Sequence, residues 1–257
     1  MVLERAYIIP HGDEILSLPN KESKEMNEII KKSTNKDSAD SILIISPHSL
    51  RLNKCIPVIN TKYLSGYYKI GKSIIRKKYE SDRELNRIIL SKCIDADEVN
   101  FITSEGKLSS FPVDFGSLIP LQFFKPKEVS ILGQWRSENR QGLINFGKCL
   151  FHSIEESDKK ITVIFSADQA HTHNSKGPYG YSPDARRYDE LVIKALKSND
   201  FDELIGIERE VIENAKPDSY WNMLSFYGFI REASLKPVFR YYYVQEYFGM
   251  IFADTAP

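Results

Sequence analysis

The sequence predicts an α/β fold, a three-layer sandwich with a mainly parallel central sheet and an active site at the carboxyl ends of the strands. Short, nearly continuous apolar runs alternate with amphipathic segments, and four of the five histidines follow an apolar run. Apolar runs of this kind are typical of parallel strands covered on both faces. Strands that alternate with helices favour an α/β sandwich. Residues 1–257 contain no linker-like stretch and no repeat, so we expect a single domain.

The apolar runs define the predicted strands, and the segments between them define the predicted helices. The predicted strands are residues 6–9, 42–45, 129–132 and 161–165. Apolar residues at helical spacing, with charged residues on the outer face, predict helices over residues 21–32, 83–93, 140–153 and 185–197.

The last third of the chain has a different character. Residues 201–215 and 218–233 are predicted to form consecutive helices, and residues 238–244 an extended aromatic segment. Sheet packing is the expected role of its tyrosines at 241–243, in preference to lining a pocket. The turn-rich loop 177–181 is either a pocket wall or a simple connection to the next helix. Two charged stretches, 31–40 and 76–83, are interpreted as solvated helix ends and loops.

Composition excludes several classes of protein. The 42% hydrophobic and 27% charged residues are ordinary for a folded domain, which excludes a disordered tail or a disulfide mini-protein. Because 35 basic residues balance 35 acidic ones, no net charge attracts nucleic acid or a membrane surface. No apolar stretch has the length of a membrane span or a signal peptide. Cys55, Cys93 and Cys149 are far apart, so we expect a cytoplasmic chain with reduced cysteines.

The placement of the histidines carries the functional signal. His11, His48 and the pair His171 and His173 each follow a predicted strand, whereas His152 lies inside a predicted helix. The carboxyl ends of parallel strands meet at one edge, where open α/β sheets bind ligands. Imidazole is the commonest metal ligand and the usual general base near neutral pH. We therefore expect a histidine-based metal or acid–base site at this edge.

A carboxylate added to two histidines would complete a facial triad, the arrangement diagnostic of non-heme Fe(II) oxygenases. Asp13 and Asp168 are candidates either for ligation or for orienting an imidazole, because they lie close to His11 and His171. Asp218 precedes a predicted helix, so an N-cap role is at least as good an interpretation on pattern alone. The carboxylates considered are Asp13, Asp114, Asp168, Asp218 and Glu246.

Four short segments, taken in order, resemble the LigB superfamily, the catalytic subunits of class III extradiol ring-cleavage dioxygenases, to which the Memo proteins are related. The segments are Ile-Ile-Pro-His11-Gly-Asp, Ser-Pro-His48, Asp114-Phe-Gly-Ser-Leu-Ile-Pro-Leu and Ser-Ala-Asp168-Gln-Ala-His171. The resemblance spans nearly the whole chain, which would make residues 1–257 a single LigB-like catalytic domain.

This resemblance implies one non-heme Fe(II), with zinc as the alternative metal. His11 and His48 match the two histidine ligands of the family, and His171 matches its acid–base histidine. The third ligand, a Glu or Cys in relatives, stands at the start of a late helix, where this chain has Asp218. The resemblance therefore favours Asp218 over Glu246.

One position departs from the family pattern. Asp114-Phe115-Gly116 stands where relatives have Asp-His-Gly, and a phenyl ring cannot donate a proton or a hydrogen bond. His173 is a candidate for the missing polar group. This departure favours the alternative of a Memo-like metal-binding redox or signalling protein without ring cleavage, whereas the carboxylate ligand favours the enzyme.

The function expected from the resemblance is extradiol ring cleavage of a catecholic aromatic with O2, with His171 moving the substrate proton. A zinc-dependent hydrolase that uses the same histidine cluster is a further alternative. The expected partners are the small aromatic substrate and O2, with no nucleic acid and no membrane. Relatives are commonly dimeric or paired with a small second subunit, so the resemblance leaves the assembly open, with a homo-oligomer as one expectation.

Overall fold

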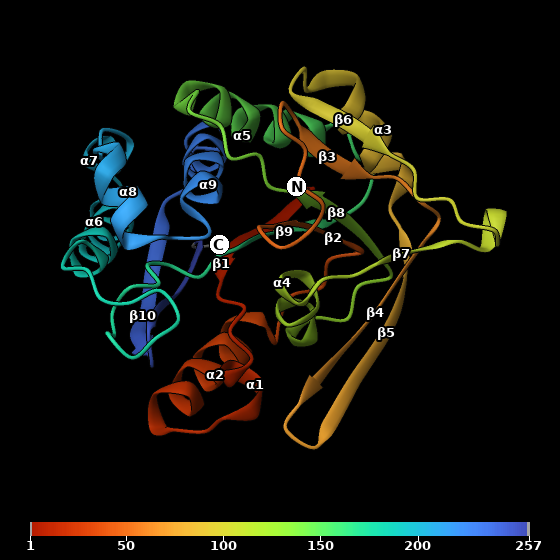
Figure 1. Ribbon diagram of the computed structural model, residues 1–257. Helices are drawn as coiled ribbons and strands as arrows, with labels where there is room; N and C mark the ends of the chain where they lie inside the picture. The colour runs from red at the N-terminus through yellow and green to blue at the C-terminus, as the bar shows by residue number, and fades with distance from the viewer. Residues whose placement is uncertain (1, 256–257) are drawn as a thin grey trace.

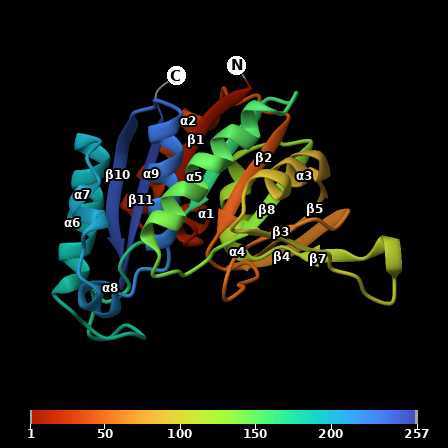
Figure 2. The same ribbon diagram turned by 90° about the horizontal axis from the view of Figure 1, so that it is seen from above.

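A computed structural model describes residues 2–255 and confirms the predicted three-layer α/β sandwich. Within these residues a mostly parallel sheet of eleven strands is covered by helices on both faces (Figures 1 and 2). The strands are Leu3–Ile9 (β1), Ser41–Ser46 (β2), Ile56–Ile59 (β3), Tyr63–Ile70 (β4), Ser73–Ser81 (β5), Ala96–Val99 (β6), Ser110–Pro112 (β7), Glu128–Gly133 (β8), Ile161–Ser166 (β9), Pro237–Gln245 (β10) and Phe248–Thr255 (β11).

The helices fall into two groups, one for each face of the sheet. One face carries Glu14–Ser17 (α1), Lys21–Thr34 (α2) and Phe115–Leu118 (α4), followed by the 3₁₀ helix Pro120–Phe123 (η2). The opposite face carries Arg83–Lys92 (α3), Arg140–Glu155 (α5), Asp184–Ser198 (α6), Asp202–Ile205 (α7), Arg209–Ala215 (α8) and Tyr220–Glu232 (α9). A second 3₁₀ helix, Gly106–Leu108 (η1), lies in the connection between β6 and β7.

The four strands predicted from apolar runs are neighbours at the centre of the sheet. The order β10-β11-β1-β9-β2-β8-β5-β4-β7 places them side by side, and every pairing among β1, β9, β2 and β8 is parallel. Helix α2 connects β1 to β2, and helix α5 connects β8 to β9. The carboxyl ends of these strands therefore meet at one edge, as the sequence predicts.

Each face of the sheet has its own hydrophobic core. Along β2, Leu43 and Ile45 pack beneath α5 and α9, whereas Ile42 and Ile44 pack toward α2 and α4. The side chains of a strand alternate between faces, so two cores require apolar residues at successive positions. This explains why β2 is a continuous apolar run.

Helices α5 and α9 approach each other closely enough to require glycine at their crossing. A Cβ atom on Gly147 would stand 1.9 Å from the carbonyl oxygen of Ser225, and one on Gly228 would stand 1.9 Å from that of Ile144. Any side chain at either position would force the helices apart.

The prediction of one helix over residues 201–215 is wrong, because the helix is interrupted. It forms two short helices, α7 and α8, separated at Gly206. The guanidinium of Arg140 donates hydrogen bonds to the carbonyls of Ile205 and Ile207, at 2.7 Å for the second. Carbonyls held by Arg140 are drawn out of continuous helical bonding, and glycine lowers helix propensity at the break.

The interpretation of residues 76–83 as helix ends and loops is wrong. Residues 76–81 belong to β5, which pairs with β4 in a long antiparallel hairpin that extends away from the body of the molecule (Figure 1). Most side chains of β5 are exposed, so charged residues are tolerated in a strand here. For the same reason, β5 lacks the alternation of apolar and polar residues by which a half-buried strand is recognised in a sequence.

The expectation of reduced cysteines is also wrong for two of the three. Cys93 at the end of α3 and Cys149 on α5 form a disulfide with 5.7 Å between their Cα atoms, while Cys55 is free. The two cysteines are 56 residues apart in sequence, and the packing of α3 against α5 brings them together. Sequence spacing alone gives no sign of this contact.

Within residues 2–255, no helix combines the length and the apolar character needed to cross a membrane.

Candidate metal centre

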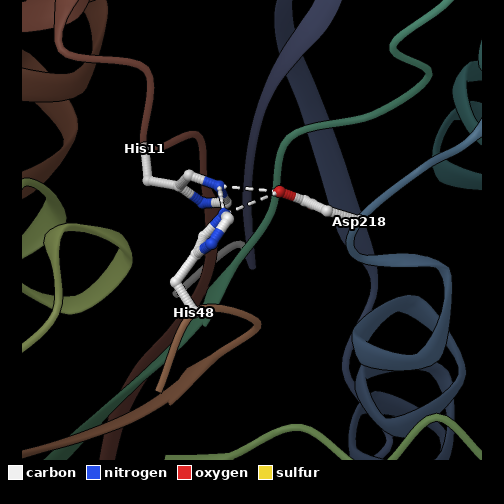
Figure 3. Close-up of side chains that lie close together, drawn as sticks. All are labelled: His11, His48 and Asp218. Carbon is white, nitrogen blue, oxygen red and sulfur yellow. Dashed lines mark hydrogen bonds and ion pairs between the residues drawn. The ribbon is translucent and has the colours of Figure 1, made fainter. Parts of the chain in front are cut away.

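Three side chains from distant parts of the chain converge at the carboxyl edge of the sheet. His11 lies two residues beyond β1, His48 lies two residues beyond β2, and Asp218 lies two residues before α9. Figure 3 shows the two imidazoles and the carboxylate directed toward a common point. The structure thus brings together the three residues expected to hold a metal.

The separations within this cluster suit a metal ion. Nε2 of His11 lies 2.9 Å from Oδ2 of Asp218, Nε2 of His48 lies 3.1 Å from the same oxygen, and the two Nε2 atoms are 3.1 Å apart. Ligand atoms at right angles, each about 2.1 Å from a metal ion, would lie about 3.0 Å from one another. Two imidazoles and one carboxylate at such spacing match a facial triad with open coordination positions.

The orientation of His11 is fixed by Ser166, the last residue of β9. The Ser166 hydroxyl donates to the carbonyl of Gly116 at 2.6 Å, so it accepts from Nδ1 of His11 at 2.9 Å. With Nδ1 carrying a proton, Nε2 is the nitrogen left to bind a metal. Ser166 was not predicted as a site residue, although a serine that ends a fully buried strand is a detectable signal.

Asp218 is held by contacts on both its side chain and its backbone. Its Oδ1 accepts from the Ser219 hydroxyl at 2.7 Å, and its carbonyl accepts from the Gln134 amide at 2.9 Å. The interpretation of Asp218 as an N-cap is wrong, because Ser219 occupies that position of α9 and Oδ2 of Asp218 faces the imidazoles.

Asn222, in the first turn of α9, ties this helix to the sheet edge. Its amide donates to the carbonyls of Ile45 and Ser166, at 3.2 and 2.8 Å. It therefore fixes Asp218 relative to the ends of β2 and β9. Nothing in the sequence pattern distinguishes Asn222 from an ordinary helix residue.

Burial and opposite charge control the titration of the cluster. Burial disfavours the charged form of His11, but Asp168 and Asp218 outweigh it and raise the pKa of His11 to about 9. Burial also opposes ionisation of Asp218, yet His11 and the hydrogen bonds from both imidazoles hold the pKa of Asp218 well below its usual range. Burial, reinforced by repulsion from Asp218, raises the pKa of Asp168.

Asp168 supports the cluster from between the two histidines. It lies two residues beyond β9, the strand between β1 and β2. Its Oδ1 accepts from the backbone N–H of His11 at 3.0 Å, and its Oδ2 lies 3.4 Å from Nε2 of His11. These contacts place Asp168 where it orients His11, one of the two roles considered from the sequence.

The other carboxylates considered as ligands are engaged or located elsewhere. Asp114 caps α4, where it accepts from the N–H of Ser117 at 2.9 Å and from the hydroxyl of Ser46 at 2.6 Å. Glu246 is exposed in the turn between β10 and β11. Asp13 is half-buried at the start of α1, where burial raises its pKa. The structure brings none of these three into the triad of His11, His48 and Asp218.

His171 lines a cavity of about 730 Å³ beside the triad, together with His48 and Asp218. Its Nδ1 donates to the carbonyl of Gln169 at 2.7 Å, so Nε2 of the neutral ring is free to accept a proton. The ring stacks on Phe248 with 5.6 Å between centroids. Tyr179 from the loop 177–181 also lines the cavity, so this loop forms a pocket wall.

His173 does not join His171 in this arrangement. Its Nε2 contacts Oδ2 of Asp189 at 2.8 Å, and Asp189 also accepts from Tyr242 at 2.7 Å. Residues two apart in a regular strand would point to the same side, but the chain bends at His171, and the side chain of His173 enters a separate network. The idea that His173 supplies a second polar group at the site is therefore corrected. His152 lies on the surface of α5, between Glu155 and Glu232.

Phe115 packs directly against both histidines of the triad. Its ring centroid lies 4.2 Å from that of His48 and 5.7 Å from that of His11. The following residue must be small, because a Cβ on Gly116 would lie 2.6 Å from Oγ of Ser46 and 3.2 Å from Cδ2 of His48. This part of the site is apolar where related sequences were expected to carry an imidazole.

Comparison with known proteins gives both a family and a fold. The family described as the catalytic LigB subunit of aromatic ring-opening dioxygenase matches residues 5–251. Protein CA_C1420 of Clostridium acetobutylicum is 23% identical over 234 residues, which cover 84% of this chain and 49% of that protein. The chain thus spans about half the length of the curated relative it matches.

The crystal structure of the uncharacterized protein JW3007 from Escherichia coli K12 has the same fold. It matches with a TM-score of 0.67 at 14% identity and covers 98% of this chain and 99% of that one. At this identity the match concerns the architecture alone. With the family match over nearly all of its length, the chain belongs to the LigB family of aromatic ring-opening dioxygenase catalytic subunits.

Proposed function

We propose that the protein is a non-heme Fe(II)-dependent extradiol ring-cleavage dioxygenase that acts on a catecholic aromatic with O2. The observation that carries this proposal is the triad itself, two Nε2 atoms and one carboxylate oxygen about 3 Å apart beside a cavity. This donor set is typical of non-heme Fe(II) oxygenases. Membership of the LigB family supports the same class of reaction.

His11, His48 and Asp218 would hold the metal, and Ser166 and Asp168 would keep His11 in position. A bound iron(II) would serve as a template for catechol and O2 and as a path for electrons between them. The reaction breaks one carbon–carbon bond of the ring next to the two hydroxyls, and both atoms of O2 enter the product.

Proton transfer in this reaction is assigned to His171. Its Nε2 would take a proton from a catechol hydroxyl when substrate enters the cavity. The same nitrogen would return the proton during ring opening. The bond from Nδ1 to the Gln169 carbonyl keeps the ring in the tautomer that this exchange requires.

The test is metal analysis of protein purified without air, followed at once by oxygen uptake with catechol, protocatechuate and DOPA. The expected result is one iron per chain, with one O2 consumed for each catechol and a yellow ring-opened product. Iron without uptake for any catechol would overturn the proposal. Tight zinc with hydrolytic activity and no oxygen uptake would favour the zinc-dependent hydrolase.

One observation favours a second candidate, a Memo-like metal-binding redox or signalling protein without ring cleavage. The Phe115 ring packs against His48, at 35° to its plane, and offers no hydrogen bond to substrate or oxygen. For this candidate, metal would be retained while all catechols fail in the oxygen assay. The Phe115→His variant separates the two, because gain of oxygen uptake on that change would identify the phenyl ring as the obstacle.

We also propose that the protein works in the cytoplasm, as a homo-oligomer with a small aromatic substrate, O2 and neither nucleic acid nor membrane as partners. Cell fractionation with detection of the protein in each fraction tests the location, and its absence from the cytoplasmic fraction would contradict the proposal. Disulfides are rare in that compartment, so alkylation of the denatured protein with and without a reductant tests separately whether Cys93 and Cys149 are bonded in cells. Light scattering measures the oligomeric state.

A further inference from the structure

Two segments of the chain extend from the body of the molecule at the end of the sheet that carries β4, β5 and β7. The first, residues 62–80, contains the β4–β5 hairpin, and we call it the basic hairpin. The second, residues 94–108, contains β6 and η1, and we call it the acidic arm. Figures 1 and 2 show both segments on the same side of the molecule. Only Glu80 and Ser81 of β5 pair with β8, so most of the hairpin stands clear of the central strands.

The basic hairpin concentrates positive charge in a chain whose net charge is zero. It contains six cations and one acidic residue, Glu80. None of the six forms an ion pair with any residue that the structure describes, whereas Lys92, Lys127 and Lys160 each pair with a carboxylate. Unneutralised cations on an exposed strand pair favour an acidic partner. The six cations are Lys62, Lys69, Lys72, Arg76, Lys77 and Lys78.

The register of the hairpin places cations beside aromatic and small residues. Tyr67 is paired with Arg76 and Ser65 with Lys78, so these four side chains share one face. The guanidinium of Arg76 lies 5.6 Å from the ring centroid of Tyr67. All four residues, together with Gly66, line a groove of about 600 Å³. An acidic chain segment with apolar side chains is the chemical complement of this groove.

The acidic arm has the opposite charge. It contains four acidic residues and one lysine, and none of the four acids forms an ion pair within residues 2–255. The Glu98 carboxylate accepts a hydrogen bond from the amide of Asn60, which is a neutral partner. Three of the acids are exposed. The four acids are Asp95, Asp97, Glu98 and Glu105.

Both segments also expose large apolar side chains. Five of these are more than half exposed, and they make up five of the nine exposed large hydrophobic side chains of the described residues. Lysines commonly protect a strand edge from unwanted pairing, but protection does not account for apolar side chains exposed beside charges of either sign. This combination is typical of a surface that a partner covers. The five are Tyr67 and Ile74 on the hairpin and Ile94, Ile102 and Leu108 on the arm.

We propose that the basic hairpin of one copy binds the acidic arm of a second copy, in a closed two-fold dimer. One chain supplies both charges and both apolar surfaces, which favours a second copy over an unrelated acidic protein. Because a two-fold axis repeats every contact, each copy gives its arm to the partner and receives the partner's arm in return. The arm occupies the groove beside Tyr67 and Lys78, and the turn at Gly71 stays free. The inference rests on the proposed homo-oligomer and not on ring cleavage.

The first measurement is the mass of the purified protein by light scattering, over roughly 1–100 µM. We expect two chains per particle at the upper concentrations. Raising sodium chloride from about 0.05 M to 0.5 M should weaken the dimer several-fold, because salt screens exposed charges. A particle that grows beyond two chains with concentration would overturn the closed arrangement.

Charge reversal tests the pairing of hairpin with arm. The combined changes Arg76→Glu, Lys77→Glu and Lys78→Glu make the groove acidic, and Asp97→Lys with Glu105→Lys reverses the net charge of the arm. Each variant alone places like charges at both contacts, so its dissociation constant should rise at least about tenfold. An equal mixture of the two variants restores opposite charges at both contacts. It should form a heterodimer with a dissociation constant within a few-fold of the unmodified protein.

The matched control is Lys21→Glu with Lys24→Glu. These exposed lysines lie at the start of α2, which packs against β10, and neither forms an ion pair with a described residue. Acidic residues suit the first turns of a helix, so the control should fold normally and dimerise like the unmodified protein. Thermal melts establish that each variant is folded. Recovery in the mixture is a further check, because a misfolded variant could not restore the dimer.

Four outcomes would overturn the interface. A dimer that persists in both reversal variants, or a mixture that stays monomeric, would leave the proposed homo-oligomer standing and remove the pairing of hairpin with arm. A monomer at every concentration would overturn both proposals. A monomer that binds oligothymidine, with loss of binding in the hairpin variant, would identify nucleic acid as the occupant. Oxygen uptake tests ring cleavage independently, since neither segment belongs to the triad or lines the cavity beside it.

Discussion

His11 and Asp218 are 207 residues apart in the chain, yet Nε2 of His11 lies 2.9 Å from Oδ2 of Asp218. His11 follows β1, one of the four neighbouring parallel strands of the sheet, and Asp218 precedes helix α9. Asn222 joins these regions by its bonds to the carbonyls of Ile45 and Ser166. A metal bound by both His11 and Asp218 would therefore connect the edge of the sheet to helix α9. Removal of the metal should lower thermal stability as well as activity.

Loss of a triad residue should abolish metal binding. In His48→Ala and Asp218→Asn we expect affinity to fall by more than the roughly 10–100-fold typical of changes outside the ligand set. Elemental analysis of folded protein measures it. The control is His152→Ala, because that imidazole pairs with surface glutamates and should leave metal content unchanged. Full metal content in His48→Ala would refute the assignment.

Replacement of His171 should separate metal binding from turnover. We expect His171→Gln to keep its metal, because Nε2 of His171 is not part of the triad. Removal of a general acid–base group should lower kcat by about 10²–10⁴-fold. Oxygen uptake and elemental analysis on the same sample measure both quantities. A kcat close to that of the unmodified protein would show that the proton moves by another route.

Metal affinity should increase with pH. The carboxylates of Asp168 and Asp218 raise the pKa of His11 to about 9 in the absence of metal, so a metal must displace a proton from this ring. Below pH 9 the apparent affinity should rise by up to about tenfold per pH unit, and it should level off above pH 9. Asp168→Asn should move that plateau to lower pH. Competition with a chelator across this range measures the effect, and a flat profile would contradict it.

Glu14 should make the fold less stable as the solution becomes neutral. Burial, followed by repulsion from Asp13 and Asp168, raises the pKa of Glu14 to about 7. A carboxyl whose pKa is higher in the folded protein than in the unfolded chain stabilises the fold when it is protonated. This stabilisation is complete below about pH 4.5 and is lost as the pH rises through 7. Because the group is partly solvated, we expect a loss of about 1 kcal/mol. Thermal melts at pH 5 and 7.5 should differ less for Glu14→Gln than for the unmodified protein.

The glycine contact between α5 and α9 should matter both for stability and for the site. Gly147→Ala should destabilise the protein by about 1–3 kcal/mol, because its Cβ would meet the Ser225 carbonyl. Displacement of α9 would also shift Asp218, so metal affinity should fall. Asn145→Ala, at an exposed position of the same helix, is the control. Chemical denaturation measures the change, and equal stability of the two variants would contradict the packing argument.

The sequence was most informative where physical constraints leave a periodic or positional signal. Burial on both faces makes β2 a run of apolar residues, and the parallel arrangement then places His11 and His48 at one edge. The family resemblance was needed to prefer Asp218, because an aspartate before a helix also fits a cap. The triad was thus predictable from strand ends together with one resemblance.

Features that depend on tertiary contacts left no such signal. Strand β5 of the β4–β5 hairpin is largely exposed, so its residues show no regular burial pattern. The Cys93–Cys149 bond arises only after α3 packs on α5. The break at Gly206 depends on Arg140, which is more than 60 residues away. In each case the deciding contact comes from a part of the chain that local patterns cannot include.

The alternation of the two cores along β2 restricts where the chain can change in length. One residue inserted among Ile42 to Ser46 would exchange the two sets of apolar side chains and turn His48 away from the triad. The exposed turn at Gly71, at the tip of the β4–β5 hairpin, carries no such constraint. A reporter peptide or an affinity tag spliced into that turn should leave the rest of the molecule undisturbed.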